Sequence, residues 1–165
     1  MDTFQLDHID RTIMQVLDRN PRASVVTIAQ ESGLARRTVH THLEKLEARG
    51  ALRPTSARVE TASLGYPIQA HVAVELDQRH INETVAALSR IPQVVEVQAP
   101  AGETDLLVRV VARDSTDLYS VSEDIRLCPG VMRTRTSMYL RTLIPYRTHQ
   151  LLHRNNPTGG AAAAK

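Results

Sequence analysis

The sequence predicts an α+β protein in which an N-terminal three-helix helix-turn-helix domain precedes a ferredoxin-like βαββαβ sandwich. Three observations support this fold class. Apolar residues recur at helical spacing through the first third of the chain. A turn that contains glycine separates two of these helical segments. Later segments then follow one another in the order β-α-β-β-α-β. We therefore divide the chain into residues 1–52 for the helix-turn-helix domain, 53–65 for a linker, 66–146 for the sandwich domain and 147–165 for a flexible tail.

The first helix is expected from Leu6 to Asn20. Asp7 and Asp10 lie near its start, where the helix dipole favours negative charge. Proline disfavours helical geometry in the residue before it, so Asn20-Pro21 ends the helix. The apolar stripe has the i, i+4, i+7, i+8 spacing of an amphipathic helix and consists of Ile9, Ile13, Val16 and Leu17.

The stretch from Ser24 to Gly50 predicts a helix, a tight turn and a second helix. Ser24 suits the N-cap of the first of these helices, because its hydroxyl can accept a hydrogen bond from a free backbone N–H. Gly33 ends that helix, where a positive φ is least costly for glycine. The second helix runs from about Arg36 to Arg49, with Val39, Leu43 and Leu46 as its apolar stripe. This is the helix-turn-helix pattern, whose second helix enters the major groove of DNA. The alternative is an ordinary helical hairpin with a solvated charged face.

The solvent side of this second helix carries the candidate DNA contacts. Arg36 and Arg37 lie at its N-terminal end, the part that meets base edges or phosphates, and an arginine can contact guanine bidentately. We expect Arg37, His40 and Thr41 to read bases. Lys45 is better placed to contact the DNA backbone. The full set of candidate DNA-binding residues is Ser24, Arg36, Arg37, Thr38, His40, Thr41 and Lys45.

The remaining elements follow from Pro54 onward. Pro54 prevents a continuing helix, 58–60 is expected to be a short extended segment, and the turn at 64–67 marks the domain boundary. Alternating or helical apolar patterns then predict strands at 68–76, 94–99, 106–112 and 131–144 and helices at 81–91 and 115–127. The inward residues of the two helices are expected to be Ile81, Val85, Leu88 and Ile91 in the first, and Leu118, Tyr119, Val121 and Ile125 in the second.

Right-handed crossovers would place both helices of the sandwich domain on one face of its sheet. The residues on the other face are not uniformly polar. A second copy of the same domain is the simplest cover for that face, so we expect a homodimer. Two recognition helices in a dimer should lie about 34 Å apart, which predicts double-stranded DNA with a pseudo-palindromic site as the partner.

Charge is distributed unevenly along a chain whose net charge is only +2. Six basic residues against two acidic ones lie between Arg36 and Arg58, whereas residues 61–130 hold ten acidic residues and five arginines. A local basic patch suits a DNA reader. The N-terminus lacks the pattern of a signal peptide, no apolar run is long enough for a membrane span, and the single Cys128 fits a reducing compartment. We expect a cytoplasmic, DNA-associated protein without a membrane partner.

Catalytic motifs are missing from the sequence. It contains no nucleophile motif, Walker loop or HExxH. His149 and His153 have the i, i+4 spacing of a metal pair, yet no third ligand is nearby, so a solvated pair is the simpler interpretation. Cys128 has no evident catalytic partner and is interpreted as a small buried residue. We expect neither an enzyme nor a bound metal or cofactor.

Six short motifs occur in order at characteristic spacings, and through them the chain closely resembles the Lrp/AsnC (feast/famine) family of regulators over about residues 6–144. They are Leu6-Asp7-x-x-Asp10, Gly33-Leu34, Leu46-Glu47-x-x-Gly50, Leu64-Gly65, Gly102-x-x-Asp105-Leu106-Leu107 and Pro129-Gly130-Val131. The resemblance implies transcription control by a small effector, often an amino acid. It also implies that the sandwich domain binds the effector and forms dimers that assemble into larger discs, usually octamers.

Given this resemblance, the turn from Ala101 to Asp105 is the candidate effector site. Its backbone N–H groups suit a carboxylate, and Glu103 or Asp105 could bind an ammonium group. Hydroxyls from the last strand of an adjacent subunit could line the same pocket. The alternative is that Gly102 only makes a hairpin turn, which Asp105 caps. The candidate effector-binding residues are Ala101, Gly102, Glu103, Thr104, Asp105, Thr134, Thr136 and Ser137.

The chain departs from the family pattern at three places. Ala35 replaces the usual serine after Gly-Leu, so the recognition helix lacks an N-cap hydroxyl. His42 stands where the family often has arginine. The effector turn reads Ala101-Gly102-Glu103-Thr104-Asp105 and lacks a hydroxyl and an aromatic ring that are common in the family. The changes in this turn imply a changed effector preference or a lost response.

Two other functions compete with this interpretation. A βαββαβ domain can bind RNA through aromatic residues on its central strands, but 106–112 contains none and the chain has only one Phe, four Tyr and no Trp. The second alternative is an amino-acid-binding regulatory subunit of an enzyme, with the helical half as a dimerisation arm.

Overall fold

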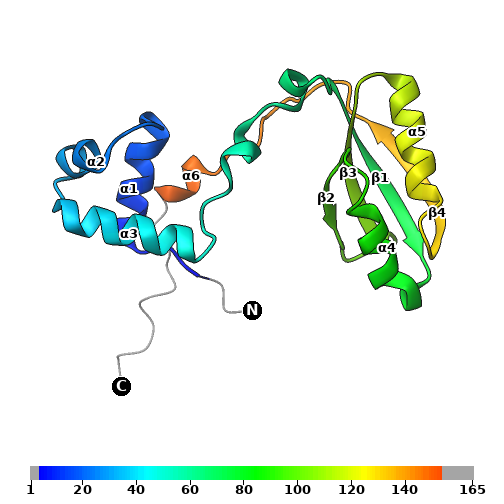
Figure 1. Cartoon of the computed structure of the whole chain (residues 1–165), viewed down its shortest axis with the longest axis horizontal. Coiled ribbons are helices and arrows are strands. Elements are labelled where there is room, and N and C mark those ends of the chain that lie inside the picture. Colours follow the sequence, from blue (N-terminus) through cyan, green and yellow to red (C-terminus); the bar gives the residue numbers. More distant parts are fainter. Residues whose placement is uncertain (1–3, 154–165) are drawn as a thin grey trace. The chain divides into compact units, whose positions relative to one another are not determined.

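The structure is a computed structural model that describes residues 4–153. The chain forms two compact units, which are drawn together in Figure 1. The first unit holds the residues up to Pro54 together with those from Ile144 onward, and the second holds Thr55–Leu143. The second unit is therefore an insertion within the first, connected to it at both of its ends.

The first unit contains the three expected helices, α1 (His8–Arg19), α2 (Val25–Ser32) and α3 (Arg36–Ala48). Their limits follow local signals. Asp7 caps α1 in a reciprocal capping box with Asp10, and the Ser24 hydroxyl accepts the N–H of Thr27 at 3.1 Å at the start of α2. Gly33 ends α2 with φ +69°. The helices bury a small apolar core that consists of Ile13, Val16, Ile28, Ala29 and Val39.

The linker after α3 differs from the expected extended segment. It contains two 3₁₀ turns, η1 (Thr55–Arg58) and η2 (Thr61–Leu64), with Val59 and Glu60 between them outside any strand. A lone extended segment would leave its backbone groups unpaired, whereas a 3₁₀ turn pairs them locally. The bond from the Ser63 N–H to the Glu60 carbonyl, at 3.0 Å, is one example.

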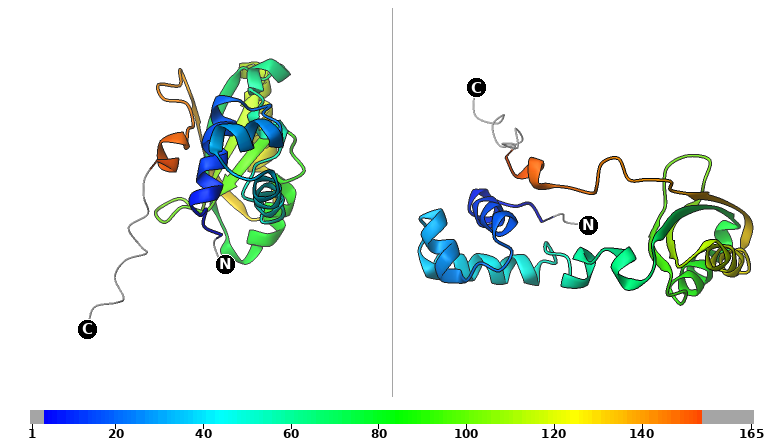
Figure 2. Two further views of the ribbon diagram at one scale, coloured as in Figure 1. Left: turned by 90° about the vertical axis from the view of Figure 1, so that its left-hand side faces the viewer. Right: turned by 90° about the horizontal axis from the view of Figure 1, so that it is seen from above.

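The second unit has the predicted βαββαβ order. The first half comprises β1 (Ile68–Leu76), the short turn η3 (Gln78–His80), α4 (Ile81–Leu88) and β2 (Val94–Gln98). The second half comprises β3 (Leu106–Ala112), α5 (Ser115–Arg126) and β4 (Val131–Met138). The strands form one antiparallel sheet in the order β2-β3-β1-β4. Both helices pack on the same face of this sheet (Figure 2), so the ferredoxin-like sandwich is confirmed.

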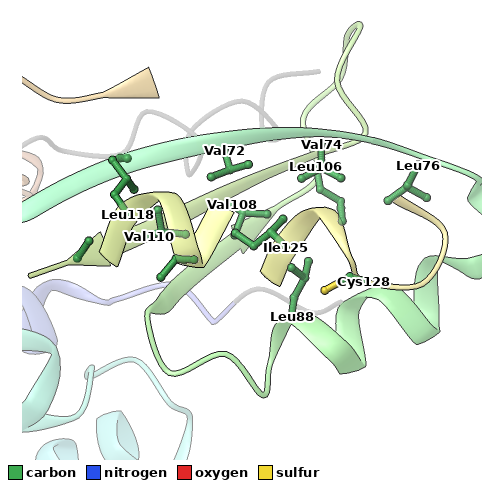
Figure 3. Packing of buried hydrophobic residues seen from close by; sticks show 13 residues of the cluster. Val72, Val74, Leu76, Leu88, Leu106, Val108, Val110, Leu118, Ile125 and Cys128 are labelled. Atoms are coloured by element: carbon green, nitrogen blue, oxygen red, sulfur yellow. The ribbon is translucent and has the colours of Figure 1, made fainter. Parts of the chain in front are cut away.

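The core of the sandwich lies between that sheet face and the two helices (Figure 3). The strands contribute the alternate, inward residues Ala70, Val72, Val74, Leu76, Leu106, Val108, Val110 and Ala112. The helices contribute Leu88, Leu118, Val121 and Ile125, and Cys128 closes one end. Period-two alternation in β1 predicted its buried face correctly.

Two expected core residues are exposed. Val85 is 43% exposed and Tyr119 is 69% exposed. Thr84 is buried in place of Val85, because its hydroxyl reaches the Pro129 carbonyl at 2.6 Å and so faces the turn before β4. Tyr119 follows the buried Leu118 in α5, and one residue of a helix is a rotation of about 100°, which carries its ring away from the sheet.

β4 is shorter than expected and ends at Met138 instead of Ile144. Met138 pairs with Ala70, close to the first residue of β1, Ile68. One further bond, from the Tyr139 N–H to the Gln69 carbonyl at 2.9 Å, completes the pairing, and beyond it the antiparallel partner strand has ended.

The segment after β4 returns to the first unit, where α6 (His149–Leu152) lies beside α1. The expectation of a tail without structure from residue 147 is therefore wrong for residues 149–152. In one contact the Arg11 guanidinium donates to the Leu151 carbonyl at 3.3 Å, and in another Gln15 Nε2 lies 3.3 Å from His153 Nδ1. The rest of the expected tail, residues 154–165, lies outside the described residues. None of the helices between residues 4 and 153 has the length and apolar character that a membrane crossing needs.

Candidate functional site

The exposed side of α3 brings together most of the candidate DNA contacts. Arg36, Arg37, His40 and Thr41 are all exposed. At about 100° per residue these positions share one side of the helix. Val39 and Leu46 are fully buried on the other side, which fixes the rotation of the helix. Thr38 is half-buried at the margin.

The start of α3 has no side-chain cap. Ala35 adopts the extended backbone of an N-cap residue (φ −67°, ψ 142°), but it makes no side-chain hydrogen bond to the helix. The expected loss of a capping hydroxyl at this position is thus present in the structure. The first N–H groups of α3 have no intrahelical partner either. They lie at the same end of the helix as Arg36 and Arg37.

Two other candidate DNA-binding residues, Ser24 and Lys45, already have partners within the chain. The Ser24 hydroxyl accepts the N–H of Thr27 and lies 2.9 Å from the Thr27 hydroxyl. The Lys45 ammonium lies 3.2 Å from Asp7 Oδ2 and 3.4 Å from Asp10 Oδ2. Lys45 therefore faces the N-terminus of α1 in the free protein. Its expected contact with the DNA backbone stays a prediction.

Lys45 belongs to a four-residue cluster that joins α1 to α3. Asp10 is completely buried, and its Oδ1 lies 2.6 Å from His42 Nδ1. Its Oδ2 accepts the Asp7 N–H at 3.0 Å. The hydrogen bond from Lys45 to Asp7 raises the pKa of Lys45. Partial burial opposes a low pKa at Asp7, yet the Asp10 N–H and Lys45 together lower the pKa of that carboxyl.

Asp7, Asp10 and His42 also form the group of metal-capable side chains found among residues 4–153, with ligand atoms within 4.8 Å of one another. The capping box, His42 and the Lys45 ammonium satisfy both carboxylates. The arrangement is that of an ion-pair cluster between two helices. Sequence reasoning identified Asp10 as a dipole partner of α1 and His42 as a departure from the family. It missed their contact, because no local pattern links residues 32 positions apart.

The candidate effector turn connects β2 to β3. Ala101, Gly102 and Glu103 are exposed, whereas Thr104 and Asp105 are half-buried. Gly102 has a φ of +146°. This backbone conformation favours glycine over residues with a side chain.

Asp105 ties this turn to the end of β1. Its Oδ2 accepts the Leu76 N–H at 2.8 Å, and its Oδ1 accepts from Gln78 Nε2 at 2.5 Å. Both carboxylate oxygens therefore have partners within the chain, and these partners lie at and after the end of β1 instead of in the turn at Gly102 that Asp105 was expected to cap in the alternative interpretation. Of the two carboxylates expected to bind an ammonium group, Glu103 is the exposed one.

The three hydroxyls expected from the last strand are not brought to this turn within one chain. β4 is at one edge of the sheet, while the turn leaves β2 at the other edge. Thr134 and Thr136 pair with the buried Val74 and Val72, so they face the helices. The Thr136 hydroxyl lies 3.0 Å from that of Ser122 in α5. Ser137 pairs with His71 and faces the opposite side.

That opposite side of the sheet is free of the unit's helices and mostly polar. Arg109 donates to Gln69 at 3.1 Å, and Arg135 donates to Glu75 at 2.9 Å. The Arg109 Nε is buried without a hydrogen-bond partner within residues 4–153. Burial, followed by the charge of Arg109, lowers the pKa of His71.

Cys128 behaves as a buried structural residue. Its thiol lies 3.4 Å from the Asp124 carbonyl, and burial raises its pKa, with the charge of Asp124 adding to the effect. A thiol with a raised pKa is a poor nucleophile near neutral pH. This agrees with the interpretation of Cys128 as a small packed side chain.

Comparison with known proteins relates both units to one group of regulators. Residues 69–148 match the family described as the Lrp/AsnC ligand binding domain, and residues 6–53 match winged helix-turn-helix DNA-binding domains. The HTH-type transcriptional regulator FL11 of Pyrococcus horikoshii is 30% identical over 137 residues, which cover 83% of this chain and 91% of that protein.

Similarity to LrpA-type regulators of Mycobacterium tuberculosis extends over nearly the full length. The HTH-type transcriptional regulator LrpA is 30% identical over 145 residues, which cover 87% of this chain and 96% of that protein. The solved structure of a feast or famine regulatory protein complexed with L-methionine is 30% identical, with a TM-score of 0.76. The alignment covers 88% of this chain and 99% of that one.

Proposed function

Because the chain belongs to the Lrp/AsnC family of transcriptional regulators, we propose that it binds double-stranded DNA through α3 and responds to an amino acid bound by the second unit. The observation that carries the DNA-binding half is the amphipathic recognition helix. Its apolar side is buried, while Arg36, Arg37, His40 and Thr41 share the exposed side.

In this mode of binding the N-terminal end of α3 meets the major groove. Arg37, His40 and Thr41 read base edges, and Arg36 and Thr38 contact phosphates or bases. The uncapped N–H groups after Ala35 support a phosphate contact, because helix N-termini attract anions. Ser24 and Lys45 add backbone contacts, for which Lys45 leaves Asp7 and Asp10.

Substitution of Arg37 by alanine tests this proposal. We expect an approximately tenfold weaker affinity for a duplex from the gene's own upstream region, because a bidentate arginine–guanine contact contributes about 1–3 kcal/mol. The affinity for a random duplex should fall less. Fluorescence anisotropy at several salt concentrations measures both. Arg90→Ala, at an exposed position of the second unit, is the matched control and should have no effect.

An unchanged specific affinity and an unchanged salt dependence in Arg37→Ala would contradict the role of Arg37. Failure of the unmodified protein to shift its own upstream region would instead favour the alternative of a regulatory subunit of an enzyme.

For the effector, we propose an amino acid at the turn Ala101–Asp105. The backbone N–H groups around Gly102 bind its carboxylate and Glu103 binds its ammonium group, while Asp105 keeps the turn on β1. Ser137 of a neighbouring copy, which faces the free side of the sheet, contributes to the pocket, whereas Thr134 and Thr136 face the helices of their own unit. The related structure complexed with L-methionine supports an amino acid as the ligand class.

Isothermal titration with each of the twenty amino acids tests the effector site. At least one should bind, and Glu103→Gln should weaken that binding, whereas Glu83→Gln on α4 should not. The absence of heat and of any thermal shift with all twenty would remove the effector hypothesis.

We also propose that a second copy covers the free face of the sheet. The buried, unpaired Arg109 Nε and the half-buried His71 support a covered face, since such groups are stabilised by a partner. The dimer would present two α3 helices about 34 Å apart to a pseudo-palindromic site and would assemble further into octamers. We expect the protein to act on DNA in the cytoplasm.

A further inference from the structure

The cluster of Asp7, Asp10, His42 and Lys45 is the polar joint between α1 and the recognition helix. The first unit also has an apolar core to which both helices contribute, and apolar contacts are not directional. The hydrogen bond between His42 and Asp10 is directional and nearly removed from water. Asp10 is completely buried, and the His42 side chain is only 17% exposed. Such a bond resists rotation or sliding of α3 on α1.

Removal of the His42 partner would leave a buried carboxylate incompletely satisfied. Asp10 would keep the Asp7 N–H at 3.0 Å and the longer contact with Lys45 at 3.4 Å. A buried charge that loses a partner is strongly unfavourable, so the helices would shift to admit water or to bring Lys45 closer. Either shift would move the exposed side of α3, which carries Arg37 and Thr41.

We propose that His42 is a positioning residue for DNA reading, which holds the recognition helix on α1 through the buried Asp10. This inference rests on the proposed role of α3 as the DNA reader. Loss of the contact should weaken binding to a specific duplex more than binding to a random one, because base reading depends on the placement of Arg37 and Thr41.

The test compares the unmodified protein with His42→Ala and His42→Asn by fluorescence anisotropy. Alanine removes a partner of Asp10, whereas the asparagine amide can take the place of the histidine Nδ1 and still donate to Asp10. We expect the specific affinity of His42→Ala to be about tenfold weaker than that of the unmodified protein, and the loss in His42→Asn to be smaller.

His149→Ala is the control, at an exposed histidine in the same unit. It should bind the specific duplex as tightly as the unmodified protein. Asp10→Asn with His42→Ala should lose less affinity than the sum of the single variants, because the two residues act through one contact. Circular dichroism establishes that each variant is folded.

A specific affinity of His42→Ala equal to that of the unmodified protein would overturn the positioning role of His42. Additive effects in the double variant would overturn the positioning pair. Failure of the proposed function is distinguishable, because the unmodified protein would then bind its upstream region no better than a random duplex.

Discussion

At the scale of single residues, buried or half-buried carboxylates hold neighbouring segments together in both units. In the first unit the Asp10 carboxylate contacts His42 and Lys45. In the second unit the Asp105 carboxylate accepts from the Leu76 N–H and so joins the candidate effector turn to β1. The Asp117 carboxylate accepts from the Arg113 N–H at the start of α5. The Asp10 and Asp105 carboxylates each have partners from at least two positions in the chain, and both oxygens of Asp117 accept from Arg113, so each of the three is a structural anchor.

Asp117 allows a prediction about pH. The Arg113 guanidinium, then the Arg113 N–H at 2.8 Å, lower the pKa of Asp117. A carboxyl whose pKa is lower in the folded than in the unfolded state stabilises the fold above the unfolded value of about 3.9. This stabilisation is lost as the pH falls through the lower, folded value. The Asp117→Asn variant should therefore unfold at a lower denaturant concentration than the unmodified protein at pH 7. The difference between the two unfolding midpoints should shrink below about pH 3.

Urea unfolding followed at both pH values measures this effect. Asp124→Asn, at an exposed position of the same helix, is the matched control and should match the unmodified protein at both. A difference for Asp117→Asn that is equally large at pH 7 and below pH 3 would show that the ion pair with Arg113 contributes nothing.

At the scale of elements, the recognition helix combines a well-buried apolar side with a weak start. Ala35 has the backbone conformation of an N-cap residue but no side chain to accept a hydrogen bond. The two preceding helices, α1 and α2, have Asp7 and Ser24 in this role. α3 is thus held by Val39, Leu46 and the His42 contact instead of a cap.

Replacement of Ala35 by serine should stabilise the first unit by about 1 kcal/mol, because a capping hydroxyl satisfies a free N–H and the backbone already has the required conformation. Guanidinium unfolding followed by far-UV circular dichroism measures the change. Ala48→Ser, at the exposed last residue of α3, makes the same chemical change without a capping role. It should be neutral or slightly destabilising. Equal midpoints for the two variants would contradict the prediction.

At the scale of the whole molecule, the chain leaves the first unit at Pro54 and returns to it at Ile144. The returning segment makes its own contacts there. Arg53 lies 4.7 Å above the ring of Tyr146 and donates to its hydroxyl at 3.3 Å, and α6 lies beside α1. Two chain segments therefore connect the effector-binding unit to the DNA-binding unit.

A chain that ends at Thr148 should lose part of the support of α1, because it lacks the carbonyl and the imidazole that Arg11 and Gln15 contact. Amide hydrogen exchange in α1 should become several-fold faster, since local opening depends on local contacts. Mass spectrometry of α1 peptides measures the exchange. A chain that ends at His153 retains α6 and should exchange like the full chain. Faster exchange in both truncated chains would mean that α6 is not the cause.

The sequence by itself determined the order and type of nearly every element, because the signals are local. Asp7, Ser24, Gly33 and the prolines mark helix limits through their own backbone and nearest neighbours. Apolar periodicity selects the buried face of α1, α3 and β1, and six motifs pointed to the family.

Tertiary structure decided what depends on residues distant in the sequence. Tyr119 and Val85 have helical spacing but point away from the core, because the sheet contacts only part of each helix. β4 ends at Met138 because β1 begins at Ile68, which no pattern within β4 can reveal. His42 meets Asp10 only when α1 and α3 are packed. Periodicity specifies which side of an element is buried, whereas the packed fold specifies what that side contacts, and a polar contact such as that of His42 depends on the latter.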